Sequence, residues 1–473
     1  MGRKQNFNSG LTRREVLKYG LYGGLAAGLS GSLWLSGCGK RPQGKRPNII
    51  LITVDTLRAD HLGCYGYHRS TSPNIDQFAA DGLLFENCFS QAAETWSGFA
   101  SMLSGFLPHE TKAMDTRRLL KAVETLPKTL RRIGYKTVGV VSNYILQRRW
   151  GWDQGFTIFD DTLNDRELVR RVPERIAEHT TDRAVELLKQ FHKDQLFMWV
   201  HYQDPHGPYT PPERFAKLFK DPDQKPRLLS VNKSLGGGGG IPSYQRLGSD
   251  RDFYHYVSQY DSEIRYTDVH FKRLIDALKR FGLYDDALII FTSDHGEEMG
   301  EHNYFFVHGN SLYNSLTYVP LIIKYGKELS GRRTDFVQYI DIVPTILKML
   351  GLKTDRRFRG CDLRKQDVTE KEIFAEVDEW GVAGGKKFSI MLDGFKLIYT
   401  PAFQQYELFD LKTDPHEERS LIYNNNYREQ GEDLKVRLNR IRNEDFLGLR
   451  VPKRRRKLTD EEIEKLKSLG YVR

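Results

Sequence analysis

Short apolar runs bounded by polar residues recur along the chain, and they predict buried strands. Ala287 to Phe291 is a run of apolar and β-branched residues that is too short for a helix. Pro47 to Asp55 is a second such run, and Lys136 to Ser142 reads as a third strand. Continuous apolar runs of this length are typical of strands buried on both faces of a parallel sheet. The pattern therefore predicts an α/β domain with a largely parallel sheet.

Longer segments carry apolar residues at helical spacing. Arg166 to Phe191 and Asp252 to Phe281 are predicted as long amphipathic helices, and Gln338 to Gly351 as a helix after a further strand. Beyond about Thr354 the pattern changes to short alternating strands at 372–378, 388–393 and 395–400. They predict a small antiparallel sheet, against which a final helix from Thr459 to Leu469 could dock.

Two of the predicted strands end in side chains that can bind a metal ion. Asp55 closes one strand, and Asp294 and His295 stand side by side just beyond another. Open α/β sheets place their ligands at the carboxyl ends of the strands, so two carboxylates at that edge could share one ion. A histidine at a strand end is more often structural, and the interpretation depends on further partners.

Thr95 lies where a loop from Ala92 runs into a short predicted helix that ends near Gly105. A hydroxyl at a helix N-terminus faces the positive end of the helix dipole and free N–H groups, which together stabilise an anion. The alternative is that Thr95 is simply the N-cap of the helix.

Composition indicates an ordinary globular protein of 473 residues, with 39% hydrophobic and 28% charged residues. The net charge of +10 falls to +6 without residues 1–37, which hold five basic side chains and one acidic one. Much of the remainder is one cluster, Lys453 to Lys457, which reads as a solvated tail or as a segment attracted to anionic lipid or polymer. The sequence has no nucleic-acid-binding motif, so nucleic acid is not expected as a partner.

The N-terminus resembles a bacterial export signal. Thr12 to Lys18 contains two adjacent arginines, an uncharged segment from Tyr19 to Gly37 follows, and Leu35 begins a short box that ends in Cys38. This resembles a twin-arginine signal joined to a lipoprotein cleavage box. It implies a signal over residues 1–37, a lipidated Cys38 that tethers the protein to a membrane facing the periplasm or cell exterior, and a polar linker over 38–46. A single anchoring helix is the alternative.

The other cysteines offer little chemistry. Cys64 and Cys88 could pair in an oxidising compartment, whereas Cys361 has no evident partner. No pair of cysteines has the spacing of a zinc site.

Several segments, taken together, resemble the sulfatase family within the alkaline phosphatase superfamily. They are residues 48–67, 72–91, 100–108, 201–212, 292–302 and 307–323, in the family's order and spacing, with 406–421 fitting its small terminal subdomain. The resemblance implies an alkaline-phosphatase-like mixed, mostly parallel sheet between helix layers. It places a catalytic domain at 47–353 and a C-terminal antiparallel subdomain with a terminal helix at 354–473. It also implies hydrolysis or transfer of a sulfuryl or phosphoryl group at one or two metal ions.

By the same resemblance, Asp55, Asp294 and His295 occupy metal-ligand positions and Thr95 occupies the nucleophile position. Sulfatases have a Cys or Ser there, within a Cys-X-Pro-Ser-Arg pattern, that is converted to formylglycine. Threonine cannot give formylglycine, and the arginine of the pattern is missing. Thr56 is a second departure, because many sulfatases have another metal-binding carboxylate at this position.

The remaining chemistry is that of a metal-activated threonine. A divalent ion held by the two carboxylates and the imidazole would lower the pKa of the Thr95 hydroxyl, which would itself be a fourth ligand. The arrangement resembles the threonine branch of the superfamily, which includes phosphodiesterases and phosphoethanolamine or glycerol-phosphate transferases. His206 and His308 fall on the family's substrate-oxyanion positions, and either could protonate a leaving oxygen.

Other residues are candidates for supporting roles. Asn143 and His201 follow or end strands and could reach the pocket, and Arg58 is expected to form an ion pair near it. His302 is expected either to support the metal pair or to cap a turn. The glycines from Gly236 to Gly240 predict a mobile insertion, which is either a lid over the site or an ordinary surface loop.

Three functions remain open at this point. The favoured one is a metal-dependent hydrolase of an anionic sulfate or phosphate ester, carried by a glycan or a lipid. The others are a transferase moving a phosphoryl-linked group onto envelope lipid or glycan, and a noncatalytic binding lipoprotein. One divalent ion is expected: Ca²⁺ by family habit, or Mn²⁺ or Zn²⁺ because one imidazole, one hydroxyl and two carboxylates suit them better.

Overall fold

The computed structural model describes residues 46–232, 238–327, 329–365, 371–378, 385–451 and 458–468. The predicted export signal, Cys38, the linker before Arg46 and the basic cluster Lys453 to Lys457 lie outside the described residues. None of the helices found in the described part is both long and apolar enough to cross a membrane.

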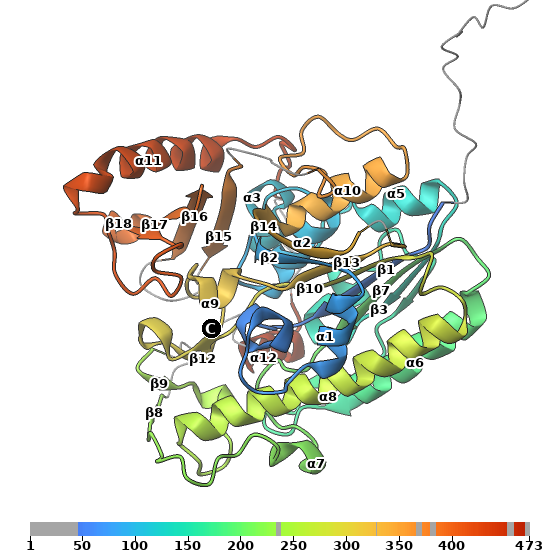
Figure 1. Ribbon diagram of the computed structural model, residues 1–473, viewed down its shortest axis with the longest axis horizontal. Coiled ribbons are helices and arrows are strands. Elements are labelled where there is room, and N and C mark those ends of the chain that lie inside the picture. The colour runs from blue at the N-terminus through green and yellow to red at the C-terminus, as the bar shows by residue number, and fades with distance from the viewer. Residues whose placement is uncertain are drawn as a thin grey trace, which may run out of the picture. The chain divides into compact units, whose positions relative to one another are not determined.

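An eight-stranded sheet organises the domain (Figure 1). Only β13 runs antiparallel to its neighbours, and every other pairing is parallel, so the sheet is mixed and mostly parallel as predicted. In spatial order the strands are β14 (Gly331–Gln338), β2 (Leu83–Phe89), β13 (Leu321–Lys324), β10 (Leu288–Ser293), β1 (Ile49–Val54), β7 (Leu196–Tyr202), β3 (Lys136–Val140) and β4 (Ile158–Asp160).

Both faces of this sheet are covered by helices, which explains why its central strands are apolar without alternation. Ile49 and Leu51 of β1 pack into one core with α2 (Thr95–Ser104), α5 (Leu126–Arg132) and α10 (Ile342–Met349). Ile50 and Ile52 point to the other face, where they pack with α1 (Pro73–Ala80), α6 (Ala177–Phe191) and α8 (Phe253–Arg280). Each strand residue is therefore buried on one side or the other.

A second, antiparallel sheet follows in the C-terminal part, as the alternating pattern predicts. Its strands are β15 (Ile373–Asp378), β16 (Lys386–Leu392), β17 (Phe395–Thr400) and β18 (Gln405–Asp410), and α11 (Arg428–Asn443) packs on it. Ile390 of β16 and Leu438 of α11 belong to the same hydrophobic core as Ile49 of the large sheet. The two sheets therefore share one continuous core, and the chain from Arg46 onward is a single compact unit.

The long helix α8 confirms the prediction for 252–281, with Asp252 as its N-cap accepting a hydrogen bond from the Tyr254 amide. The predicted helix at 166–191 is wrong over its first eleven residues. A hairpin of β5 (Asp165–Arg166) and β6 (Pro173–Glu174) precedes α6, because Pro173 cannot donate a helical hydrogen bond and Arg171 has a left-handed φ of 62°.

Three further expectations are corrected by the structure. The final helix, α12 (Asp460–Ser468), lies with the Lys465 ammonium 5.5 Å from the ring centre of Tyr144, in the segment after β3, and not on the antiparallel sheet as expected. Cys64, Cys88 and Cys361 are all free thiols, so the predicted pairing of the first two is wrong. The helix predicted from Gln338 begins only at Ile342, because Gln338 is the last residue of β14.

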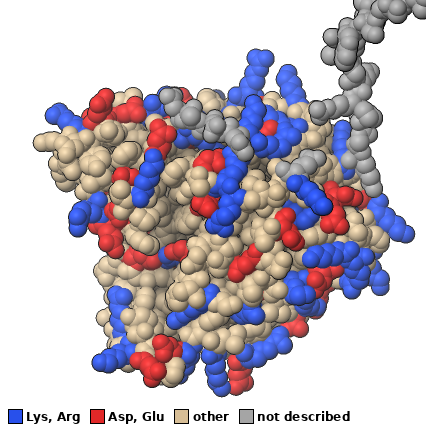
Figure 2. Space-filling model, in the orientation of Figure 1, with Lys and Arg blue, Asp and Glu red and all other residues tan. Residues whose placement is uncertain are grey.

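The remaining short elements connect these layers. They are α3 (Pro108–Thr111), α4 (Ala113–Thr116), α7 (Glu213–Ala216), α9 (Asn314–Thr317), β8 (Ser230–Val231), β9 (Gly240–Ile241), β11 (Glu298–Met299) and β12 (Phe305–Val307). On the face shown in Figure 2, basic and acidic side chains are interspersed.

Candidate active site

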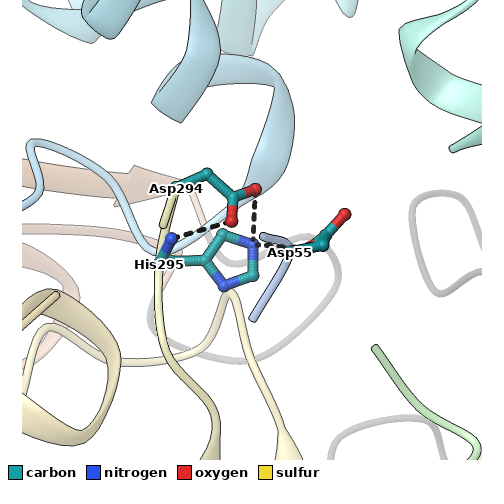
Figure 3. A group of neighbouring side chains, drawn as sticks. All are labelled: Asp55, Asp294 and His295. Atoms are coloured by element: carbon teal, nitrogen blue, oxygen red, sulfur yellow. Dashed lines mark hydrogen bonds and ion pairs between the residues drawn. The ribbon is translucent and has the colours of Figure 1, made fainter. Parts of the chain in front are cut away.

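The adjacent strands β1 and β10 bring three predicted ligands together. The two strands pair in parallel with Val54 opposite Ser293, so Asp55 and Asp294 leave the sheet side by side. Asp55, Asp294 and His295 each offer one ligand atom, and these atoms lie within 4.8 Å of one another (Figure 3). The His295 Nε2 atom lies 3.5 Å from an oxygen of Asp294 and 3.9 Å from one of Asp55. All three side chains are fully buried.

Thr95 joins this cluster from the start of α2. Its Oγ1 lies 3.2 Å from the Nε2 of His295. Gly98, one turn later, packs against Asp294, where an added Cβ would lie 3.4 Å from the Asp294 carbonyl oxygen, an ordinary van der Waals contact. Glu94 is the N-cap of α2 and Thr95 is its first residue, so the alternative that Thr95 is only the N-cap is wrong.

Two residues expected near the pocket contact Asp55 directly. The Asn143 amide donates a 2.8 Å hydrogen bond to Asp55 Oδ2, and the His201 Nε2 lies 3.5 Å from the same oxygen. The other oxygen of Asp55 and the Oδ2 of Asp294 are buried and have no hydrogen-bond partner in the described part of the chain. Buried carboxylate oxygens are normally paired, and these two are placed to bind a cation.

Electrostatics at the cluster also favour a cation. Burial would raise the pKa of Asp55, but the imidazole of His201 and two further histidines hold it well below its usual range. Burial, followed by the charge of Asp55, raises the pKa of Asp294 to about 6. Two carboxylates held together in a buried site repel each other, and a divalent ion between them would remove that repulsion.

His295 is prepared to act as a ligand through Nε2. Its Nδ1 lies 2.8 Å from the Gly296 carbonyl oxygen, which can only accept, so Nδ1 carries the proton. The lone pair of the neutral ring is then on Nε2, which faces both carboxylates. This is how metal-binding histidines are usually oriented, and the residues present fit a divalent ion.

His206 and His308 lie next to the cluster in different electrostatic environments. Their ring centres are 5.0 Å apart, and the His308 ring is 4.6 Å from that of His295. Burial lowers the pKa of His206 to about 3, and its Nδ1 donates to the Gly207 carbonyl oxygen. Burial would also lower the pKa of His308, but Glu297, whose Oε1 lies 3.1 Å from its Nδ1, raises it instead.

Of the other two predicted residues, Arg58 has the expected role and His302 does not support the metal pair. Arg58 forms the expected ion pairs, at 2.7 Å with both Asp60 and Glu301, and also donates to the Glu297 carbonyl oxygen. The interpretation of His302 as a support for the metal pair is wrong. Its ring stacks on Tyr313 at 3.5 Å, and its Nε2 contacts the carbonyl oxygen of Glu417.

Part of the glycine-rich insertion makes backbone contacts with residues 303 and 304. Gly238 bridges Tyr304, and the Gly239 amide donates to the Asn303 carbonyl oxygen. Gly238 and Gly239 are therefore attached to the segment that follows Asp294 and His295, and Gly240 pairs with Ser230 of β8. Gly236 and Gly237 lie outside the described residues.

Sequence reasoning missed two residues of the site. Glu297, fully buried beside His308, follows the metal pair by two positions, where a charged residue would ordinarily be solvated. Gly296 allows a close approach to Ser315, since a Cβ there would lie 2.1 Å from the Ser315 carbonyl oxygen. Nothing in the sequence pattern marks Glu297 as a residue of the site. A glycine directly after Asp294 and His295, by contrast, could have indicated that another backbone segment passes close to Gly296.

The chain is similar to known sulfatases along most of its length. A family model described as Sulfatase matches residues 47–352, and one described as N-sulphoglucosamine sulphohydrolase, C-terminal, matches 300–444. An N-acetylglucosamine-6-O-sulfatase of Bacteroides thetaiotaomicron is 24% identical over 503 aligned positions, which cover 85% of this chain and 88% of the relative.

Solved structures share the fold. The structure of BT4656 in complex with its substrate D-glucosamine-2-N,6-O-disulfate superposes with a TM-score of 0.71 at 21% identity, over 84% of this chain and 98% of that one. Phosphonate monoester hydrolase of Agrobacterium radiobacter superposes with a TM-score of 0.68 at 22% identity, over 84% and 95%. With its matched family model, its α/β fold and its buried acid and imidazole cluster, the chain belongs to the sulfatase family of ester hydrolases.

Proposed function

We propose that the protein is a metal-dependent hydrolase of sulfate or phosphate esters that uses Thr95 as its nucleophile in place of formylglycine. The observation that carries this proposal is the 3.2 Å separation between Thr95 Oγ1 and His295 Nε2, within a buried cluster that also holds Asp55 and Asp294. A hydroxyl at the start of a helix and beside a cation site is in the position that an attacking oxygen needs.

The reaction follows from the positions of these residues. A divalent ion, when bound, would lower the pKa of the Thr95 hydroxyl and offset charge on the ester oxygens. Thr95 Oγ1, which loses its proton to solvent, forms a bond to sulfur or phosphorus while the bond to the leaving alcohol breaks. His308, which lies beside His295 and is held by Glu297, donates a proton to the leaving oxygen. Water then attacks the sulfur or phosphorus of the Thr95 ester and gives a proton to His308, so that the sulfate or phosphate product leaves and Thr95 recovers its hydroxyl proton from solvent.

The substrate class is proposed from the names of the relatives and from the chemistry of the site. The two structural neighbours are named for a sulfated glucosamine and for phosphonate monoesters, so both sulfur and phosphorus esters are substrates within this fold. We propose an anionic ester on a glycan or a lipid. Two carboxylates, one imidazole and one hydroxyl favour Mn²⁺ or Zn²⁺ over Ca²⁺, which prefers a larger set of oxygen ligands.

We further propose that the enzyme is exported and anchored to a membrane through lipid on Cys38. The support is the pair of adjacent arginines, Arg13 and Arg14, followed by an uncharged segment and the box that ends in Cys38. Mass spectrometry of the membrane fraction should find a mature chain that begins at a lipidated Cys38. A Cys38→Ala chain recovered with the same lipid and in the same fraction would refute the anchor.

The threonine mechanism is tested by metal analysis together with three substrates. Wild type, Thr95→Ala and Thr95→Ser are compared on an aryl sulfate, a phosphate monoester and a phosphodiester. We expect the alanine variant to lose turnover by at least about 100-fold and the serine variant to retain part of it, because serine keeps the hydroxyl. Rapid quenching of wild type should also trap sulfur or phosphorus on Thr95.

Undiminished turnover in Thr95→Ala would show that water attacks the ester directly, and the proposal for Thr95 would then be wrong. Purified protein that neither contains nor binds a divalent ion, but still turns over substrate, would instead refute the metal dependence.

A further inference from the structure

A cavity of about 240 Å³ lies between the large sheet and the loop that follows β18. Its walls also include part of the segment after β1 and the turn at Glu301 and His302. The described residues assigned to the ester site do not line it: Asp55, Thr95, His206, Asp294, His295 and His308. The cavity is therefore a second pocket, and the proposed reaction makes no use of it.

Part of the lining is apolar and largely aromatic. The rings of Phe89 and Phe336 stack with their centres 6.0 Å apart, and the ring centre of Tyr318 lies 5.8 Å from that of Phe89. Leu411 and Pro415 extend this wall. The face of an aromatic ring carries partial negative charge, so such a wall attracts cations as well as apolar groups.

Another part of the lining is charged, with an excess of carboxylates. The Arg58 guanidinium binds Asp60 through hydrogen bonds of 2.9 and 2.7 Å and Glu301 through one of 2.7 Å. The side chains of Asp60 and Glu301 are 41% and 26% exposed, so a ligand can reach them. Glu417, the third carboxylate, is paired with Lys396 at 2.8 Å. With its imidazoles neutral, the described lining therefore carries one negative charge in excess.

The hydrogen-bonding capacity that remains in the lining is mainly that of acceptors. The Nε2 of His302 donates to the Glu417 carbonyl oxygen, so its Nδ1 carries a lone pair, and this buried atom has no hydrogen-bond partner in the described part of the chain. Each nitrogen of the Arg58 guanidinium and the hydroxyls of Ser315 and Tyr318 donate to protein oxygens. A ligand that suits this lining must therefore donate hydrogen bonds.

From these features we infer that the cavity binds a small organic ammonium ion, with its charged group at Asp60 and Glu301 and its apolar part against the aromatic wall. An ammonium group supplies both the missing positive charge and the missing donors. A carboxylate or phosphate would be repelled by the two acidic side chains, and a purely apolar molecule would leave the acceptors without partners. We call this pocket the ammonium site.

The test measures the binding of three small probes that share a phenyl ring and differ in charge. The full-length protein is titrated by calorimetry at pH 8 and constant ionic strength with benzylammonium chloride, benzyl alcohol or sodium benzoate. At this pH an imidazole ordinarily carries no charge. Arg58 is left unchanged in every variant, because its guanidinium also donates to the Glu297 carbonyl oxygen beside His308.

The variants separate the ammonium site from other acidic groups. Asp60→Asn removes one charge of the site, and Phe336→Leu removes a ring but keeps an apolar side chain. Asp355→Asn is the matched control, because Asp355 also pairs with an arginine two residues away, Arg357, but lies outside the cavity. Asp294→Asn removes a carboxylate of the ester site, where a cation could also bind.

We expect benzylammonium to bind wild type at least about 10-fold more tightly than benzyl alcohol does, and benzoate not to bind. Asp60→Asn should weaken benzylammonium binding by at least about 10-fold, the range for a lost hydrogen bond to a charged group. Phe336→Leu should weaken it by about 2- to 5-fold through the lost attraction between cation and ring. Asp355→Asn and Asp294→Asn should bind as wild type does.

If Asp60→Asn does not fold, Glu301→Gln gives the same comparison, because it removes the other exposed carboxylate of the site. Equal affinity for the three probes, or no binding of benzylammonium at millimolar concentration, would overturn the inference. Wild-type affinity in folded Asp60→Asn or Glu301→Gln protein would overturn it as well. Loss of binding in Asp294→Asn alone would place the cation in the ester site, which also contradicts the inference.

Discussion

Gly296→Ala is the change that tests most directly how tightly the site is packed. A Cβ at this position would lie 2.1 Å from the Ser315 carbonyl oxygen and 3.3 Å from Cγ of Arg58. Real Cβ contacts are essentially never shorter than 3.0 Å, so the two backbones must separate by about 1 Å. Gly296 cannot move alone, because its amide donates to the Leu316 carbonyl oxygen and its own carbonyl oxygen holds the ring of His295.

The expected cost follows from this geometry. Forcing extra atoms into a packed interior typically destabilises a protein by about 1–3 kcal/mol. The shift is transmitted to His295, and a misplacement of about 1 Å at a reacting centre can lower the rate about 100-fold. Urea denaturation of the metal-free protein measures the first effect, and ester turnover with saturating ion measures the second.

Gly431→Ala is the control for the same substitution. Gly431 lies in the interior of α11, where an added Cβ would meet only Leu408 and Ile422 at ordinary distances of 3.6 and 3.8 Å. Alanine is the better helix former, so this variant should be more stable by about 0.5–1 kcal/mol and fully active. A Gly296→Ala protein with wild-type stability and turnover would show that the close approach to Ser315 is not a real constraint.

Three further predictions concern the surroundings of the site and the core. Asn143→Ala removes the amide that orients Asp55, and calorimetry should show divalent-ion affinity about 10- to 100-fold lower; unchanged affinity would mean that the contact is incidental. Burial raises the pKa of Glu298 to about 8, above its unfolded value near 4.5, because the folded protein favours the neutral carboxyl. The free energy of unfolding that this group contributes is therefore complete below pH 4.5 and is lost as the pH rises through 8. In urea denaturation series between pH 5 and 8, the free energy of unfolding of Glu298→Gln should depend less on pH than that of wild type. If the two proteins show the same pH dependence, Glu298 is not the group responsible. Leu438→Ala should cost about 2–5 kcal/mol and lower the midpoint of one cooperative transition, because the core is continuous between the two sheets; separate melting of the C-terminal part would contradict this.

The strands and three of the candidate ligands could be predicted from the sequence because both depend on local pattern. Apolar runs mark interior strands, and the carboxyl ends of parallel strands meet at one edge, so Asp55, Asp294 and His295 were predictable as a group. The place of Thr95 at the start of a helix was also predictable from the sequence and agrees with the start of α2, whereas its role as nucleophile rests on the family resemblance.

Other features could not be read from side-chain spacing. The hairpin before α6 depends on Pro173 and on the left-handed Arg171, which a helical periodicity overlooks. The left-handed φ of 54° at Thr56 is a backbone property that leaves no mark on hydrophobic pattern. The placement of α12 depends on contacts between segments distant in the chain, and an amphipathic stripe indicates only that a helix has a buried face.

The pairing of β1 with β10 has a consequence for the order of events during folding. Ile49 and Leu288 are neighbours in the sheet although 239 residues separate them in the chain. Contacts between such remote segments are slow to form, since a long loop must close before they contribute free energy. In the proposed holoenzyme, ion uptake would therefore come late, after helices such as α8 have formed. A stopped-flow experiment with a metal indicator dye would time the completion of the sheet, independently of any probe attached to the protein.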